Sequence, residues 1–239
     1  TTLAASMINA IARNQKKGNL EGRLFEVGNK FIAKELPLAE YPDERETLCV
    51  GIFGDSEDFF TLKGIIEQLM AELSATVTYT RSSEPYLHPG RQALVKANNK
   101  EIGCFGEVHP AVAASYGIEE KVYVAEIKLD VLLTIEKRKT TYKPLPKFPA
   151  VERDFAMLVD AEVPVGTLEK AISSGAGRLL EKIELFDVYT GNQVEEGKKS
   201  VAYNIVLRAA DRTLTDEETE SAVKKILKAL SAVGAELRM

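Results

Sequence analysis

The spacing of apolar residues in the first part of the chain predicts two amphipathic helices and several short strands. Apolar residues recur at helical spacing within residues 3–17 and again within residues 55–73. Alternating or continuous apolar runs predict strands at residues 22–28, 29–36, 46–54, 75–82, 91–97, 101–108 and 121–129, with a short helix at 110–116. This order indicates a mainly antiparallel sheet with helices, an α+β arrangement.

Turn and capping residues predict where some of these elements begin and end. We expect tight turns at Gly28–Asn29 and at Asn98–Asn99, because glycine and asparagine accept the positive φ angles of two-residue hairpin turns. Asp58 or Asp55 can cap the helix that follows it.

The last part of the chain predicts the order β-α-β-β-α-β. The strands are expected at residues 152–160, 183–189, 200–208 and 235–239, and the helices at 163–177 and 212–230. The second strand breaks at Gly191, where a loop opens toward the third strand. Thr215 and Glu218 form a capping box for the second helix. A segment of roughly ninety residues is a normal size for one domain, with a sheet covered by helices on one face.

Residues 137–149 are expected to form a linker between the two parts. They contain three prolines and several lysines. Proline fixes φ and removes a backbone donor, so this segment predicts a stiff, extended connection. We therefore expect one domain over residues 1–136 and a second over residues 150–239.

Composition places the chain among globular proteins and limits how it can bind nucleic acid. Hydrophobic residues make up 45% and charged residues 28% of its 239 residues. We expect a cytoplasmic chain, since no signal peptide or membrane span is visible, and a fragment of something longer, since no initiator methionine precedes the first helix. A formal net charge of -5 argues against general attraction to nucleic acid, so any such contact must use a local face.

Alternation along the strands of the last part predicts which side chains share that face. If Phe155, Met157 and Val159 face the helices, together with every second residue of the third strand, the other residues face away. The uncovered face then carries Asp154, Ala156, Leu158, Asp187, Tyr189, Ser200, Ala202, Asn204 and Arg208. It can be an ordinary solvated sheet face, or a surface that stacks and reads single-stranded bases.

Other residues that often carry chemistry have structural interpretations. His88 and His109 each directly precede a proline in a predicted turn between strands. Neither has a cysteine or histidine at metal-ligand spacing, or a serine or cysteine nucleophile beside it. Cys49 and Cys104 lie in apolar strand-like runs and are expected to be buried thiols rather than a disulfide. We expect no catalytic residue and no metal ligand in this chain.

Several segments resemble one family in order along the chain. With FPAVERDF and RTLTDEE on either side, the stretch IELFDVYTGNQVEEGKKS resembles the ferredoxin-fold anticodon-binding domain that closes the bacterial phenylalanyl-tRNA synthetase beta subunit. RLFEVG, DFFTLKG, YLHPGRQA and IGCFGEVHP resemble the second half of the class II synthetase-like module before that domain. The resemblance implies a partial class II-like antiparallel sheet followed by a ferredoxin-like domain.

The same resemblance implies a non-catalytic scaffold and an anticodon-binding domain. The expected partners are the alpha subunit, in an α2β2 enzyme, and tRNA-Phe, with no membrane or DNA contact. ATP, Mg²⁺ and phenylalanine would bind the other subunit, and no cofactor would bind this chain. The sequence is consistent with a first domain that has no active site. Arg23 and Glu26 are spaced one residue wider than the Arg and Glu of the second class II motif, and HPGRQA has only one Gly and one Arg, too few to predict a site for ATP phosphates.

Candidate tRNA contacts come from the resemblance and from charge. Ala156 in RDFA, Tyr189 in DVYTG and Ser200 in KKS match positions that line the anticodon in the family. Lys198, Lys199, Arg208 and Arg212 are inferred phosphate contacts.

Two other functions remain open. A single-chain organellar-type synthetase would show ATP-dependent pyrophosphate exchange by this chain alone. An amino-acid-binding regulatory module of the ACT type would bind phenylalanine at its last domain in calorimetry.

Overall fold

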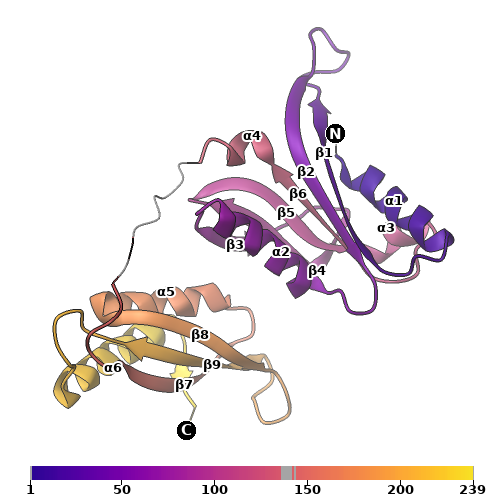
Figure 1. Ribbon diagram of the computed structural model, residues 1–239. Coiled ribbons are helices and arrows are strands. Elements are labelled where there is room, and N and C mark those ends of the chain that lie inside the picture. The colour runs from indigo at the N-terminus through magenta and orange to yellow at the C-terminus, as the bar shows by residue number, and fades with distance from the viewer. Residues whose placement is uncertain (1, 136–141, 143, 239) are drawn as a thin grey trace. The chain divides into compact units, whose positions relative to one another are not determined.

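A computed structural model describes residues 2–135, 142 and 144–238. The chain divides into two compact units, residues 1–141 and 142–239 (Figure 1). Residues 137–141 and 143 of the expected linker lie outside the described residues.

The first unit is built on a six-stranded antiparallel sheet. Its strands are β1 (Gly22–Ile32), β2 (Asp43–Phe53), β3 (Val77–Arg81), β4 (Leu87–Ala97), β5 (Lys100–Val108) and β6 (Val122–Lys128), in the spatial order β1-β2-β6-β5-β4-β3. Helices α1 (Ala4–Lys16) and α3 (Pro110–Ser115) bury one apolar cluster with the sheet. Helices α2 (Phe59–Glu72) and α4 (Leu129–Leu132) bury a second, which includes Ile52 and Phe105. The sheet is therefore covered by helices on both faces.

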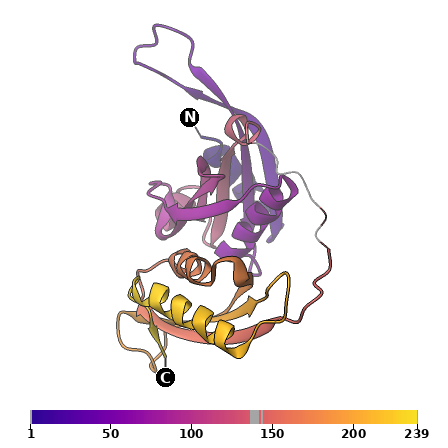
Figure 2. The same cartoon turned by 90° about the vertical axis from the view of Figure 1, so that its left-hand side faces the viewer.

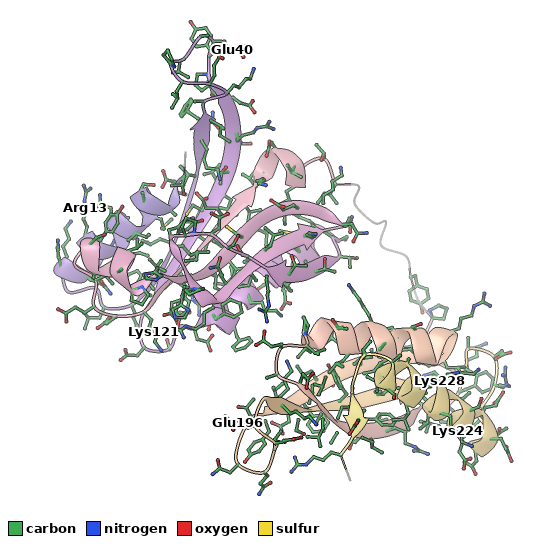
Figure 3. The ribbon with its side chains drawn as sticks, turned by 180° about the vertical axis from the view of Figure 1, so that it is seen from behind. Arg13, Glu40, Lys121, Glu196, Lys224 and Lys228 are labelled. Carbon is green, nitrogen blue, oxygen red and sulfur yellow. The ribbon has the colours of Figure 1, made fainter. Side chains whose placement is uncertain are left out.

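The first hairpin differs from the sequence prediction. The predicted turn at Gly28–Asn29 is wrong: β1 continues through both residues, which pair with Thr47 and Glu46 of β2. The eleven residues of β1 pair with β2 without a register break, so the chain reverses within residues 33–42 instead. The two strands extend together beyond the rest of the sheet, with Glu40 in the loop at their outer end (Figure 3).

Local signals at other element ends are confirmed. Asn98 and Asn99 both have positive φ, 47° and 66°, in the turn between β4 and β5. Asp58 caps α2 by accepting a hydrogen bond of 2.6 Å from the Thr61 N–H, and this backbone donor lowers the pKa of the Asp58 carboxyl.

The second unit has the predicted order β-α-β-β-α-β. It consists of β7 (Val151–Asp160), α5 (Val165–Ala176), a 3-10 turn (Gly177–Leu179), β8 (Leu180–Tyr189), β9 (Lys198–Leu207), α6 (Asp216–Ser231) and β10 (Glu236–Leu237). The antiparallel sheet has the spatial order β10-β7-β9-β8. Both helices pack on one face of it (Figure 2). Thr215 and Glu218 form the predicted capping box of α6.

The core of the second unit lies between its sheet and its two helices. Tyr203 of β9 is fully buried there, and its hydroxyl donates a 3.3 Å hydrogen bond to the Val165 carbonyl oxygen. A Cβ on Gly175 of α5 would come within 2.6 Å of the Ile226 Cα, so only glycine allows α5 to approach α6 this closely. Among the described residues of this unit, no helix packs on the other face of the sheet. Among the described helices of both units, none is long and apolar enough to span a membrane.

Candidate nucleic-acid interface

The uncovered face of the second sheet, which we call the open face, is ordered in rows across three strands. The predicted alternation is confirmed, since Phe155, Met157 and Val159 of β7 are buried on the helix side. Residues paired in an antiparallel sheet point to the same side. The pairing therefore sets three rows on the open face: Leu158–Ser200–Tyr189, Ala156–Ala202–Asp187 and Asp154–Asn204–Glu184.

Four of the seven predicted site residues meet on this face. Ala156, Ser200 and Tyr189 occupy two neighbouring rows, and Lys198 lies two residues before Ser200 on the same strand. The Lys198 ammonium pairs with Glu195 at 2.8 Å, and this hydrogen-bonded carboxylate raises the lysine pKa. Ala156 and Ala202, in the row beside Tyr189, have small side chains that do not block a flat base from the ring. Ser200 and Ala202 are themselves buried, at 4% and 8% exposed.

Sequence reasoning missed Arg238, which the short strand β10 brings to the open face. Its backbone N–H donates to the Ala156 carbonyl oxygen at 2.8 Å. Its guanidinium donates to the Ser200 hydroxyl and to the Gln193 side-chain oxygen, each at 3.4 Å. Both acceptors are neutral, and among the described residues no ion pair engages Arg238. The alternation rule could have found this residue, had it been applied to the last strand as well as the first three.

The other three predicted contacts lie elsewhere and are held by the protein itself. Lys199 faces the helix side, where its ammonium donates to the carbonyl oxygens of Ala161 at 3.0 Å and Val163 at 2.6 Å. Burial lowers the pKa of Lys199. This cation satisfies loop carbonyls before α5 and is not presented to a ligand on the open face.

The two predicted arginines lie beyond the end of β9 and are already paired. Arg208 follows the end of β9, eight residues from Ser200 or about 26 Å along an extended strand, and pairs with Glu181 at 2.5 Å. It also donates to the Phe148 carbonyl oxygen. Arg212 pairs with Glu218 at 2.6 Å beside the start of α6. The structure therefore does not bring these two arginines together with Tyr189.

In the first unit, the arginines of the class II-like segments both pair with carboxylates. Arg91 of HPGRQA donates twice to the Glu107 carboxylate, at 2.5 and 2.7 Å, and Glu107 is 2% exposed. Arg23 pairs with Glu57 at 2.8 Å. Each guanidinium thus has a carboxylate partner within the protein.

The histidines and cysteines of the first unit have structural roles. His88 and His109 each accept a local backbone N–H at Nδ1, from Gly90 at 3.0 Å and from Ala111 at 3.2 Å. Cys49 and Cys104 are free and buried, and burial raises their pKa values to about 12 and about 11. Across residues 2–135, 142 and 144–238, no cluster of three or more acidic, histidine or cysteine side chains could hold a metal ion.

A second notable surface is an apolar stripe on β1, the edge strand of the first sheet. Phe25, Val27 and Phe31 alternate along this strand and are 76%, 50% and 52% exposed. Their β2 partners Val50 and Leu48 pack against the cluster that contains α2. The stripe thus continues a buried face of the sheet onto a part that no described helix covers.

Comparisons with known proteins match both units. The family model described as "Phenylalanyl tRNA synthetase beta chain CLM domain" matches residues 1–129, and the one described as "Ferredoxin-fold anticodon binding domain" matches residues 146–238. Phenylalanine--tRNA ligase beta subunits of Clostridium tetani and Clostridium acetobutylicum are 47% and 44% identical over 100% of this chain. The Bacillus subtilis counterpart is 36% identical over 96% of it.

The matched region is only part of those relatives. This chain spans about 30% of the length of each of these curated proteins. Among solved structures, a pyrrolysyl-tRNA synthetase of Desulfitobacterium hafniense covers 55% of this chain, and this chain covers 48% of it, with 16% identity and a TM-score of 0.44, too low to support a conclusion. Family models and relatives together show that the chain belongs to the phenylalanyl-tRNA synthetase beta-chain family and carries its ferredoxin-fold anticodon-binding domain.

Proposed function

We propose that this chain is the C-terminal part of a synthetase beta subunit, and that the open face of its second unit binds the anticodon of tRNA-Phe. The observation that carries this proposal is the meeting of Ala156, Tyr189, Ser200 and Arg238 on one face that no described helix covers. The ring supplies a stacking surface, and the guanidinium supplies a polar group for base edges or phosphate. Ser200 is 4% exposed and accepts a hydrogen bond from that guanidinium, so its role is to hold Arg238.

Charge limits this site to contacts with single cations, because the open-face rows also carry the carboxylates of Asp154, Glu184 and Asp187. The whole chain has a formal net charge of -5, so its overall field repels nucleic acid. Arg238 is held by two neutral oxygens and keeps its positive charge available on the open face. Lys224 and Lys228 project from α6 on the helix-covered side, away from the proposed site (Figure 3).

Arg238→Ala is expected to lower the salt dependence of tRNA-Phe binding by the assembled enzyme. Loss of one phosphate contact to a single strand reduces the slope of log affinity against log salt by about 0.7. Arg212→Ala is the matched control, because that guanidinium is already paired with Glu218 and Asp211. Equal slopes for Arg238→Ala and the unchanged enzyme would remove Arg238 from the site.

The first unit, residues 1–136, is proposed to be a scaffold that contacts the alpha subunit of an α2β2 enzyme in the cytoplasm. Residues 137–149 would connect it to the anticodon-binding unit, residues 150–239. ATP, Mg²⁺ and phenylalanine would bind the alpha subunit, which performs the ligase chemistry. The pairing of Arg91 with Glu107 and of Arg23 with Glu57 supports this assignment over a single-chain synthetase.

The apolar stripe on β1 supports a scaffold role and predicts self-association of the isolated chain. Phe25, Val27 and Phe31 expose apolar area that an assembly partner would bury. Light scattering is expected to show a concentration-dependent rise in mass, which Phe25→Ser with Phe31→Ser should reduce. A strict monomer at all concentrations would contradict this use of the stripe.

A further inference from the structure

The Tyr189 ring occupies space that a side chain at position 191 would need. An ideal Cβ built on Gly191 would lie 2.1 Å from the Tyr189 hydroxyl oxygen, 2.3 Å from Cζ and 2.8 Å from Cε2. Contacts below 3.0 Å are essentially never seen for real Cβ atoms. The hydroxyl end of the ring therefore lies over the Gly191 backbone, and any residue other than glycine would displace it.

The need for glycine at this position comes from the ring and not from backbone strain. Gly191 is not among the glycines with φ in the left-handed region, so alanine can adopt its backbone conformation. The Gly191 carbonyl oxygen accepts a 3.0 Å hydrogen bond from the Val194 N–H, which fixes the turn after β8. With the turn fixed, the mobile partner is the ring, which can rotate about its side-chain bonds.

We propose that Gly191 is a positioning residue for tRNA recognition. Because it lacks a side chain, the Tyr189 ring can rest on the turn at the end of the Leu158–Ser200–Tyr189 row. The ring is thereby held beside the Ala156–Ala202–Asp187 row before a base arrives, so less side-chain freedom is lost when the base stacks on it. This inference rests on the proposed function, since it names what orients the stacking residue.

A double-mutant cycle in the assembled enzyme tests the coupling between Gly191 and the ring. Gly191→Ala is expected to weaken tRNA-Phe binding by roughly three-fold to ten-fold, a part of the stacking contribution. In a Tyr189→Ala background the same substitution should change binding by less than about two-fold, because the ring is no longer there. Gly166→Ala in α5 is the matched control, since a Cβ there meets nothing within 4 Å.

A second measurement reads the position of the ring without tRNA. In the chain labelled with fluorotyrosine, the ¹⁹F resonance of Tyr189 should shift in Gly191→Ala and stay in place in Gly166→Ala. An unshifted resonance in Gly191→Ala would overturn the inference even if tRNA binding changed.

The binding outcomes separate this inference from the proposed function. If Tyr189→Ala weakens binding but Gly191→Ala does not, the positioning role is wrong and the anticodon site stands. An equal loss from Gly191→Ala with and without the ring also overturns the positioning role. If Tyr189→Ala leaves binding unchanged, the proposed function itself fails.

Discussion

Replacing Tyr189 by alanine is expected to weaken tRNA-Phe binding by the assembled enzyme roughly ten-fold to a hundred-fold. Stacking of a base on an aromatic ring contributes about 1–3 kcal/mol, and about 1.4 kcal/mol corresponds to each factor of ten. The ring is half-buried at the end of β8, outside the apolar core of the second unit. Binding should therefore fall while the unfolding midpoint of the chain moves little.

Two control variants separate stacking from packing. Tyr189→Phe should keep most of the binding, because the ring supplies the stacking surface. Tyr203→Ala should instead cost about 3–5 kcal/mol of stability, since Tyr203 is fully buried between the sheet and the helices. Unfolding of the chain by Tyr189→Ala would show that the ring packs in the core. Unchanged tRNA binding would show that the ring does not contribute to binding.

Arg91→Ala is expected to destabilise the first unit by about 1–3 kcal/mol, the typical cost of leaving a buried polar group without its partner. Glu107 is 2% exposed and receives both hydrogen bonds from Arg91, so the substitution leaves a buried carboxylate without its cation. Chemical unfolding followed on the 239-residue chain measures the effect. Arg45→Ala is the control, because its partners Asp43 and Asp130 are 39% and 30% exposed, and it should destabilise the unit much less than Arg91→Ala.

A double replacement tests whether the Arg91 effect comes from the lost charge pair. Arg91→Met with Glu107→Leu should recover most of the stability, since apolar residues of similar volume often substitute for a buried pair at little cost. A stable Arg91→Ala variant would contradict the structural role of the pair.

The sequence could predict features set by local signals and by alternation. Helix caps and tight turns involve only neighbouring backbone groups, so a few adjacent residues are enough to predict them. This holds for the caps at Asp58 and Thr215 and for the turn at Asn98–Asn99. Alternation in β7 and β9 correctly identified the residues that pack against the helices, because both strands are central and one side of each must be buried. It did not predict that Ser200 and Ala202, on the other side of β9, are buried as well.

Features that depend on distant partners could not be predicted in this way. Gly28–Asn29 looked like a turn, but pairing with β2 keeps β1 extended through it. The sequence shows that Lys199, Arg208 and Arg212 are charged, but it does not show their partners. In the fold, Lys199 donates to backbone carbonyls, and each arginine pairs with a carboxylate. Arg238 reaches the open face because β10 pairs with β7, more than seventy residues earlier in the chain.

Cross-linking from the anticodon tests directly whether the open face of the second unit binds it. The assembled enzyme is irradiated with tRNA-Phe that carries one photoreactive base in the anticodon, and the linked peptides are identified by mass spectrometry. We expect links to the open-face residues of β7, β8 and β9 and to Arg238, and their loss when unlabelled tRNA-Phe competes. Links confined to α5 or α6, where Lys224 and Lys228 lie, would contradict this expectation.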